Sequence, residues 1–251
     1  MEHEIGATAA EDLERLLRDA GPELLLALVR GHAAAMSAAA ARQALRNPYL
    51  SSEVVDLLAA QPRLLAFYKV RRDLVRSPCC SEALALRHLA GLFWRDLVAI
   101  GLDTRLHPRL RAAADSQVAA RLPALSVGEK VTIARRASAA VIAQLLSDPS
   151  PRVIAAVLDN PRLTEGALAR LAHRETAPAP SLRLIAEDRR WGARYDIRVA
   201  LARNPRTPAA TALRLLATLR KPDLAAVSSD PRVEETVRRR ARLLLGQVEG
   251  D

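Results

Sequence analysis

The chain has 251 residues, half of them hydrophobic, which is enough for a large core in one or two domains or in one extended array. Only 3% are aromatic and Ala and Leu dominate, so the composition favours helices over strands. No apolar run is long enough for a transmembrane helix, no signal peptide pattern opens the chain, and two adjacent cysteines exclude a disulfide framework; we therefore expect a cytoplasmic protein.

The net charge of +10 is unevenly distributed along the chain. Residues 1–60 carry 5 Arg or Lys against 9 Asp or Glu, whereas residues 183–248 carry 15 against 7. A basic surface can attract nucleic acid, anionic lipid or an acidic protein. Nearly all of this charge is arginine in an Ala-rich chain, a usage that is also typical of GC-rich coding sequence, so a solvated surface without a partner is the simpler interpretation.

A short proline-containing sequence pattern, which we call the punctuation, recurs along the chain after residue 40. Residues 1–40 lack it, and we predict a regular helical cap there. From 41 to 251, Asn-Pro or Ser-Pro followed by a small polar or proline residue closes one apolar helical segment and opens another, at 47–51, 77–81, 160–164 and 204–208. Such recurrence predicts stacked helical units, continuous with the cap in a single elongated domain.

The same punctuation predicts how each helix starts and stops. The hydroxyls of Ser51, Ser81 and Thr164 are expected to cap the following helices, as is Thr207 with Pro208 at the first helical position. Asn204 is expected to adopt the left-handed conformation that ends a helix.

A second type of helix start carries a different signal. Ser126-Val-Gly-Glu129 predicts a capping box, because Ser and Glu are three residues apart just before an apolar run. Helices are also predicted to begin at aspartates, whose carboxylates suit a helix N-terminus: Asp103, Asp148 and Asp230. No segment gives a convincing strand signal, so we expect short helices throughout.

A longer internal similarity links distant parts of the chain. When 74–114 is placed against 201–241, a shift of 127 without a gap, 17 of 41 positions are identical. The matches include a proline and several charged pairs: Arg76/Arg203, Arg87/Arg214, Asp96/Asp223, Asp103/Asp230, Arg105/Arg232 and Arg111/Arg238. Recurrent charges of this kind usually make ion pairs between neighbouring layers, and a ligand-binding ladder is the alternative.

Two segments resemble a known family. DPSPRVIAAVLDNPRLTEGALARLA (148–172) and IRVALARNPRTPAATALRLLA (197–217) are similar to leucine-rich repeat variant units, which belong to the HEAT-like α-solenoids. The similarity is partial at 41–60 and 74–114 and weak before 40. It implies an all-α superhelix of stacked short helices, often with a binding role. Some members carry a cysteine-ligated iron–sulfur cluster, but this chain lacks such a cysteine group, so no cofactor is expected.

Patterns for catalysis or metal binding are weak. The five histidines are scattered, and neither a metal-ligand spacing nor a phosphate-binding loop occurs. Cys79 and Cys80 precede a predicted helix, whose N-terminus could lower a thiol pKa; simple packing of these small side chains is favoured instead. No catalytic, cofactor-binding or metal-binding residue is therefore predicted.

Arginine and aromatic residues gather near 189–198 and give the strongest candidate binding surface. Arginines beside exposed aromatic rings can grip a nucleic-acid backbone and stack on bases, as in HEAT-like alkylpurine DNA glycosylases. The alternative is that Trp191 and Tyr195 wedge between helices. The candidate surface comprises Arg189, Arg190, Trp191, Arg194, Tyr195, Arg198, Arg206, Arg214 and Arg87.

Stacked helical units offer an extended concave surface, so the sequence favours a non-enzymatic scaffold or adaptor that binds another protein. Nucleic-acid binding through an arginine-rich groove, with or without base-repair chemistry, is the second hypothesis. An enzyme built on HEAT-like repeats, such as a lyase, is the third.

Overall fold

The protein is described by a computed structural model covering residues 12–248 of the chain. Within that range every regular element is a helix and no strand occurs, which confirms the all-α prediction. The chain divides into two compact units, Met1–Ala120 and Arg121–Asp251, which we call the first and second unit. The predicted boundary at 40/41 falls inside a helix, and residues 1–11 of the predicted cap lie outside the described part.

The first unit contains a helix over 12–19 and then eight labelled helices among its described residues. They are α2 (Pro22–His32), α3 (Ala38–Arg46), α4 (Ser52–Ala59), α5 (Pro62–Ala66), α6 (Tyr68–Val75), α7 (Glu82–Leu89), α8 (Trp94–Leu102) and α9 (Pro108–Arg121). Four of them, α3, α4, α6 and α9, are followed within three residues by a proline, which cannot continue a helix.

The second unit begins at Arg121, the last residue of α9, and continues with a single 3-10 turn, η1 (Leu122–Ala124), and nine α-helices in its described residues. They are α10 (Val127–Ala134), α11 (Ala139–Leu145), α12 (Pro151–Leu158), α13 (Glu165–Ala172), α14 (Ala179–Glu187), α15 (Tyr195–Arg203), α16 (Ala209–Leu216), α17 (Lys221–Ser229) and α18 (Glu235–Val248).

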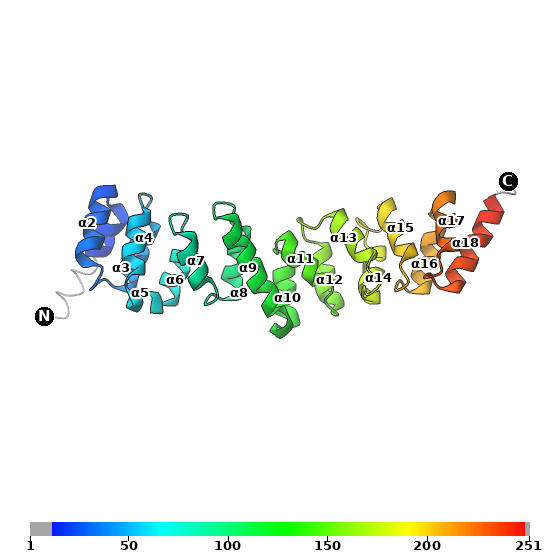
Figure 1. Ribbon diagram of the computed structural model, residues 1–251, viewed down its shortest axis with the longest axis horizontal. Helices are drawn as coiled ribbons and strands as arrows, with labels where there is room; N and C mark the ends of the chain where they lie inside the picture. The colour runs from blue at the N-terminus through cyan, green and yellow to red at the C-terminus, as the bar shows by residue number, and fades with distance from the viewer. Residues whose placement is uncertain (1–11, 249–251) are drawn as a thin grey trace. The chain divides into compact units, whose positions relative to one another are not determined.

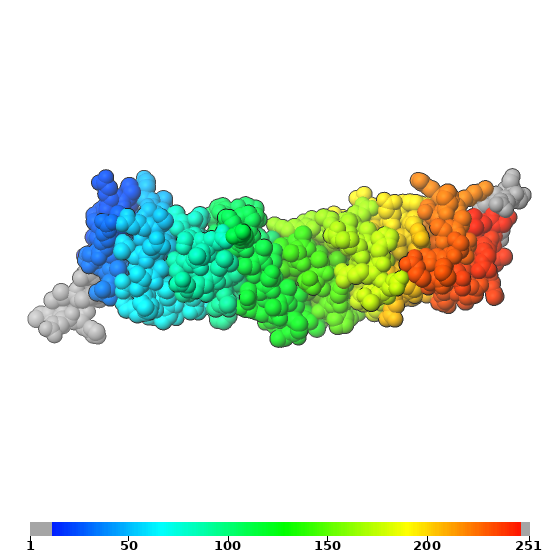
Figure 2. All heavy atoms as spheres, in the orientation of Figure 1, coloured from blue at the N-terminus to red at the C-terminus, as the bar shows by residue number. Residues whose placement is uncertain are grey.

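The core of each unit consists of small aliphatic side chains. In α12, Val153, Ile154 and Val157 are buried, the spacing of one helical face. Helices that lie two apart along the chain pack together, as α2 does on α4, α10 on α12, α13 on α15 and α16 on α18. Figure 1 shows successive helices side by side within each unit, and the atoms of neighbouring helices touch in the space-filling view of Figure 2.

The predicted caps are only partly confirmed. Ser51 accepts from the Val54 N–H and Thr164 from the Ala167 N–H, and Ser126 forms the predicted capping box with Glu129. Ser81 stands at the N-cap of α7, but its hydroxyl makes no capping bond. A punctuation serine thus marks a helix start even where its side chain does not cap it.

Thr207 and Asn204 behave differently from prediction. Thr207 is buried and donates to the Leu201 carbonyl of the preceding helix, while Pro208 takes the N-cap of α16. Asn204 has an extended backbone with φ −80° and ψ 124°, so the left-handed prediction is wrong. The Asn204 side chain donates a hydrogen bond to the Ala172 carbonyl, and the chain turns at Asn204 without a positive φ.

The aspartates predicted to start helices instead form turns after helices. The Oδ1 atom of Asp103 accepts from the Arg105 N–H at 3.2 Å, and that of Asp230 accepts from the Arg232 N–H at the same distance. Asp148 likewise accepts from the Ser150 N–H at 2.9 Å, three residues before α12 begins. Each carboxylate therefore closes a tight turn between two helices, and the predicted helix starts are wrong.

Buried asparagines join three of the described turns to an earlier helix. The Asn160 side chain donates to the carbonyl of Ala134, the last residue of α10, and the Asn204 side chain to that of Ala172, the last residue of α13. Asn47 donates in the same way to the carbonyls of Leu17 and Ala20, each at 2.9 Å. Their amides satisfy carbonyls that a helix C-terminus leaves free, across two helices of the chain.

The two units share helix bounds at a shift of 127. Adding 127 to the bounds of α7, α8 and α9 gives those of α16, α17 and α18, and α3, α4 and α6 match α13, α14 and α15 to within one residue. Side-chain bonds recur as well: the Tyr68 hydroxyl donates to Asp96, and the Tyr195 hydroxyl to Asp223. The correspondence therefore extends beyond the sequence segments in which it was first visible.

Candidate functional site

The predicted arginine and aromatic surface begins at the turn between α14 and α15. Asp188 Oδ1 accepts from the Arg190 N–H at 2.9 Å and the Trp191 N–H at 2.8 Å, which tightens the chain. A Cβ atom on Gly192 would lie 2.8 Å from the Asp188 carbonyl oxygen and closer still to that of Ala186, so only glycine fits. This turn fixes the side chains that follow it.

Trp191 lies in the interior and not on a surface. Its side chain is 2% exposed, and the indole N–H donates to the Leu158 carbonyl at the end of α12, over 3.2 Å. The guanidinium of Arg190 covers the ring at 4.3 Å. The wedge that the sequence left as an alternative is thus what the structure contains, and Trp191 performs the role that asparagine amides perform at other turns.

Tyr195 is held at the start of α15 by several groups. Its hydroxyl accepts from the Arg220 N–H at 2.9 Å and donates to Asp223, and burial together with the Asp223 bond raises its pKa. Arg198 and Arg220 place guanidinium groups 5.4 and 4.6 Å from the ring centre. Because two guanidinium groups already lie over the ring, Tyr195 is poorly placed to stack on a base.

The remaining predicted residues are exposed but dispersed. Arg194 lies 3.8 Å from Glu165, and Arg214 lies 3.6 Å from Glu187. Arg189 and Arg206 are exposed, and Arg87 lies on α7 in the other compact unit. The structure therefore joins Arg190 to Trp191 and Arg198 to Tyr195, and it does not gather the whole set into one site.

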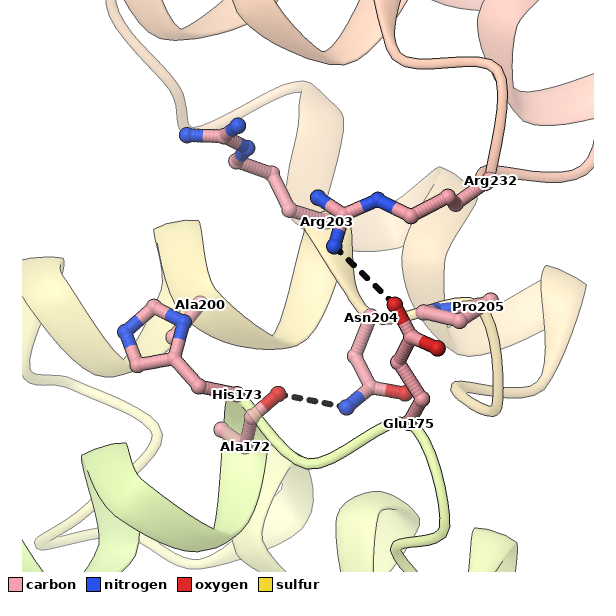
Figure 3. A pocket seen from close by; sticks show the side chains of 8 residues that line it. All are labelled: Ala172, His173, Glu175, Ala200, Arg203, Asn204, Pro205 and Arg232. Atoms are coloured by element: carbon pink, nitrogen blue, oxygen red, sulfur yellow. Dashed lines mark hydrogen bonds and ion pairs between the residues drawn. The ribbon is translucent and has the colours of Figure 1, made fainter.

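A different site emerges beside the Asn204 turn of the second unit. A small cavity of about 110 Å³ is lined by Ala172, His173, Glu175, Ala200, Arg203, Asn204, Pro205 and Arg232. Figure 3 shows the Glu175 carboxylate facing the Arg232 guanidinium, with the Asn204 amide turned to the Ala172 carbonyl. A side chain of the protein itself thus occupies part of this cavity.

A larger cavity lies at the corresponding place in the first unit. It encloses about 560 Å³ and is lined by Leu45, Arg46, Asn47, Pro48, Leu50, Arg72, Asp73, Arg76, Ser77, Pro78, Cys79 and Arg105. Four of these residues are arginines against one aspartate. We call it the arginine pocket. All eight residues of the smaller cavity have their counterparts in this lining at a shift of 127.

Ion pairs organise the charges of the arginine pocket. Asp73 receives hydrogen bonds from Arg42 at 2.8 Å and from Arg72 at 2.6 Å; burial raises its pKa, but these bonds outweigh burial and leave the pKa below its usual range. Asp103 is bound by Arg105 through Nε and Nη2, and this pair lowers its pKa too. Both carboxylates therefore remain charged and committed to arginine.

Cys79 lines the arginine pocket, and Cys80 is the next residue along the chain. The Cys79 thiol donates to the Leu50 carbonyl at 3.1 Å, and burial raises the pKa of the Cys80 thiol to about 12. A thiol with so high a pKa is protonated at neutral pH and is a poor nucleophile. For Cys80, packing is the interpretation that the structure favours.

Sequence reasoning missed the arginine pocket, although part of its signal was present. The pairs Arg76/Arg203 and Arg105/Arg232 were visible at the shift of 127, and they line both cavities. One of the predicted ion pairs is present at Asp230, which lies 3.6 Å from Arg203, the last residue of α15. The sequence comparison did not extend to Pro48 and Glu175, the positions at which the two cavities differ most.

Two broader searches concern residues 12–248 alone. No helix there has both the length and the apolar character to cross a membrane. Nor do three or more His, Cys, Asp or Glu side chains come together in this range as metal ligands would. In comparisons with known proteins, the chain matches no protein family, no curated protein and no solved structure.

Proposed function

We propose that the chain is an α-solenoid of the HEAT-like, leucine-rich repeat variant type. Three observations support this: helices two apart along the chain pack together, helix bounds recur at a shift of 127, and buried asparagines at several turns bind the ends of earlier helices. Each feature is what a stack of similar helical layers requires, because every layer meets the same neighbour.

The function supported best is a non-enzymatic interaction module that binds another protein. The observation that carries this proposal is the state of the polar groups around the two related cavities. Asp73, Asp103 and Asp230 are held by arginines with lowered pKa values, so they are unsuited to proton transfer near neutral pH. What these cavities offer is a set of positioned arginine donors, which suits recognition.

The test is reconstitution with an identified partner. The tagged chain is purified from its source cells, co-purifying proteins are identified, and each is expressed and recombined with the chain as purified components. We expect a saturable complex with defined stoichiometry and slower hydrogen exchange on described helices of this chain. A chain that combines with no purified candidate, or that instead turns over a substrate, would contradict the proposal.

Nucleic-acid binding by stacking is less well supported, because Trp191 is buried and Tyr195 is flanked by arginines. We predict that DNA binds weakly, with dissociation constants of about 10⁻⁴ to 10⁻⁶ M at physiological salt and a log–log salt slope of about −0.9 per phosphate contact. Fluorescence anisotropy with duplex and single-stranded DNA across a salt series measures both. Submicromolar binding at physiological salt that is lost in Arg194→Ala would favour the nucleic-acid hypothesis.

A further inference from the structure

Arg105 and Arg232 occupy equivalent turns and use their guanidinium groups in the same way. Arg232 donates through Nε and Nη2 to Asp230 at 3.0 and 2.7 Å, and Arg105 donates through the same atoms to Asp103 at 2.9 and 2.7 Å. This two-pronged geometry fixes the plane of each guanidinium and leaves Nη1 on its far side. The two Nη1 atoms can therefore be compared directly.

The Nη1 atoms differ in what they meet. In the second unit, Arg232 Nη1 donates to the Glu175 carboxylate at 3.2 Å, as Figure 3 shows. In the first unit, Arg105 Nη1 has no hydrogen-bond acceptor among the described residues. The residue equivalent to Glu175 is Pro48, which lies at the same turn position but carries no carboxylate.

The larger cavity and the more positive charge around Arg105 are consistent with the lack of a carboxylate acceptor for its Nη1 atom. The arginine pocket encloses about 560 Å³, whereas the cavity that holds Glu175 encloses about 110 Å³. Among lining residues, Arg46, Arg72, Arg76 and Arg105 against Asp73 give +3 in the first unit. Arg203 and Arg232 against Glu175 give +1 in the second unit, with His173 neutral.

We propose that the arginine pocket binds a carboxylate from an acidic segment of a partner protein, with Arg105 Nη1 as a direct donor. Glu175 shows the chemistry, because it is the group that the equivalent guanidinium binds within this same chain. The second unit carries its own ligand, and the first unit takes the corresponding group from another molecule. This inference rests on the proposed function and names the chemical class of the partner.

A matched set of variants isolates the pocket. Pro48→Glu places in the first unit the residue that the second unit has, so an internal carboxylate should occupy Arg105 and exclude a ligand. Pro48→Gln changes the same position without adding charge, and Ala83→Glu adds the same charge on an exposed residue of α7. Arg105→Gln removes the donor, and Arg109→Gln removes an equal charge from an exposed arginine outside the pocket lining.

The probe is a fluorescein-labelled hexaglutamate peptide, titrated with the full chain and followed by anisotropy. Arg105→Gln and Pro48→Glu should each weaken binding about tenfold, the size expected for loss of one charge-assisted hydrogen bond. Pro48→Gln, Ala83→Glu and Arg109→Gln should stay within about twofold of the unsubstituted chain. Because Pro48→Glu retains the Arg105–Asp103 pair, it tests the pocket even if Arg105→Gln fails to fold.

Three results would overturn the assignment. Equal weakening by the pocket and control variants would mean that the peptide responds only to net charge. If a short DNA duplex bound more tightly than the peptide, and this binding were lost in the same two pocket variants, the result would identify phosphate as the ligand. A purified protein partner that binds Pro48→Glu and Arg105→Gln normally would refute the pocket assignment while leaving the interaction-module proposal intact.

Discussion

Asn204 shows how one side chain can both close a turn and join it to an earlier helix. It is 5% exposed, its amide donates to the carbonyls of Ala172 and Arg174, and its Oδ1 accepts from the Arg206 N–H. Ser77, the equivalent residue in the first unit, keeps only the turn bond, to the Cys79 N–H at 3.2 Å. A comparison of Asn204 with Ser77 thus distinguishes two roles of the side chain: it closes the turn, and it joins the turn to the earlier helix.

Replacing Asn204 should measure these two contributions. Asn204→Ala removes every bond of the side chain and leaves buried partners unsatisfied, so we expect a loss of about 1–3 kcal/mol in the free energy of unfolding. Asn204→Ser keeps the turn bond and should lose less. Urea denaturation followed by far-UV circular dichroism gives both values, and two unchanged midpoints would show that the amide bonds are unimportant.

Asp230 makes stability depend on acid pH. The hydrogen bonds from Arg232 are the main cause that lowers its pKa from the ordinary 3.8 to about 2. Its contribution is therefore fully present above about pH 4 and is lost as the pH falls toward 2, because the unfolded chain takes up the proton first. Asp230→Asn keeps the turn acceptor but removes the charge.

The stability difference between the unsubstituted chain and Asp230→Asn should consequently be constant from pH 7 to about pH 5 and shrink toward pH 2.5. Chemical denaturation at each pH measures it, and Asp159→Asn, at a residue for which the structure records no ion pair with a described residue, is the control. A difference that stays the same across this range would mean that the Arg232 pair does not stabilise the fold.

At the scale of elements, helix starts could be predicted where the cap is local. Ser51, Thr164 and Ser126 bond to N–H groups three residues ahead, so their roles are written in adjacent sequence. Thr207, by contrast, turns back to the Leu201 carbonyl, and the Asn204 amide reaches Ala172 and Arg174, more than 25 residues away in the chain. Propensity gives no information about partners of the latter kind, which depend on packing.

The cap assignments give a comparison of three equivalent punctuation residues. Ser51→Ala and Thr164→Ala should each lose about 0.5–2 kcal/mol of unfolding free energy, because each hydroxyl accepts from a free N–H at a helix start. Ser81→Ala should have a much smaller effect, since Ser81 makes no capping bond. Thermal or urea midpoints decide, and a loss at Ser81 equal to those at the other two would show that the hydroxyl bonds are not the cause.

At the scale of the whole molecule, the central feature is a pair of compact units with corresponding helices. The correspondence was predictable for 74–114, where proline and charged residues match, but not for the region of Pro48 and Glu175, where the residues themselves differ. That difference decides whether a cavity is filled from within or open. The candidate site could therefore not be predicted from the sequence, because it depends on Glu175 in the second unit and on the lack of a carboxylate at Pro48 in the first.

The arginine cluster predicted at 189–198 illustrates the opposite case. Its residue types are those of a nucleic-acid surface. Trp191, however, is buried and donates a hydrogen bond to the end of α12. Tyr195 is held by contacts with Asp223, Arg198 and Arg220. Composition alone did not distinguish an aromatic ring that supports a turn from one that meets a ligand. Burial decides between them.

The most direct test is a crystal structure of the chain with a glutamate-rich peptide. We predict one peptide in the first unit, with a carboxylate accepting from Arg105 Nη1, while Glu175 still accepts from Arg232 Nη1 in the second unit. A peptide bound instead to the exposed arginines near 189–198, or to both units alike, would contradict the account.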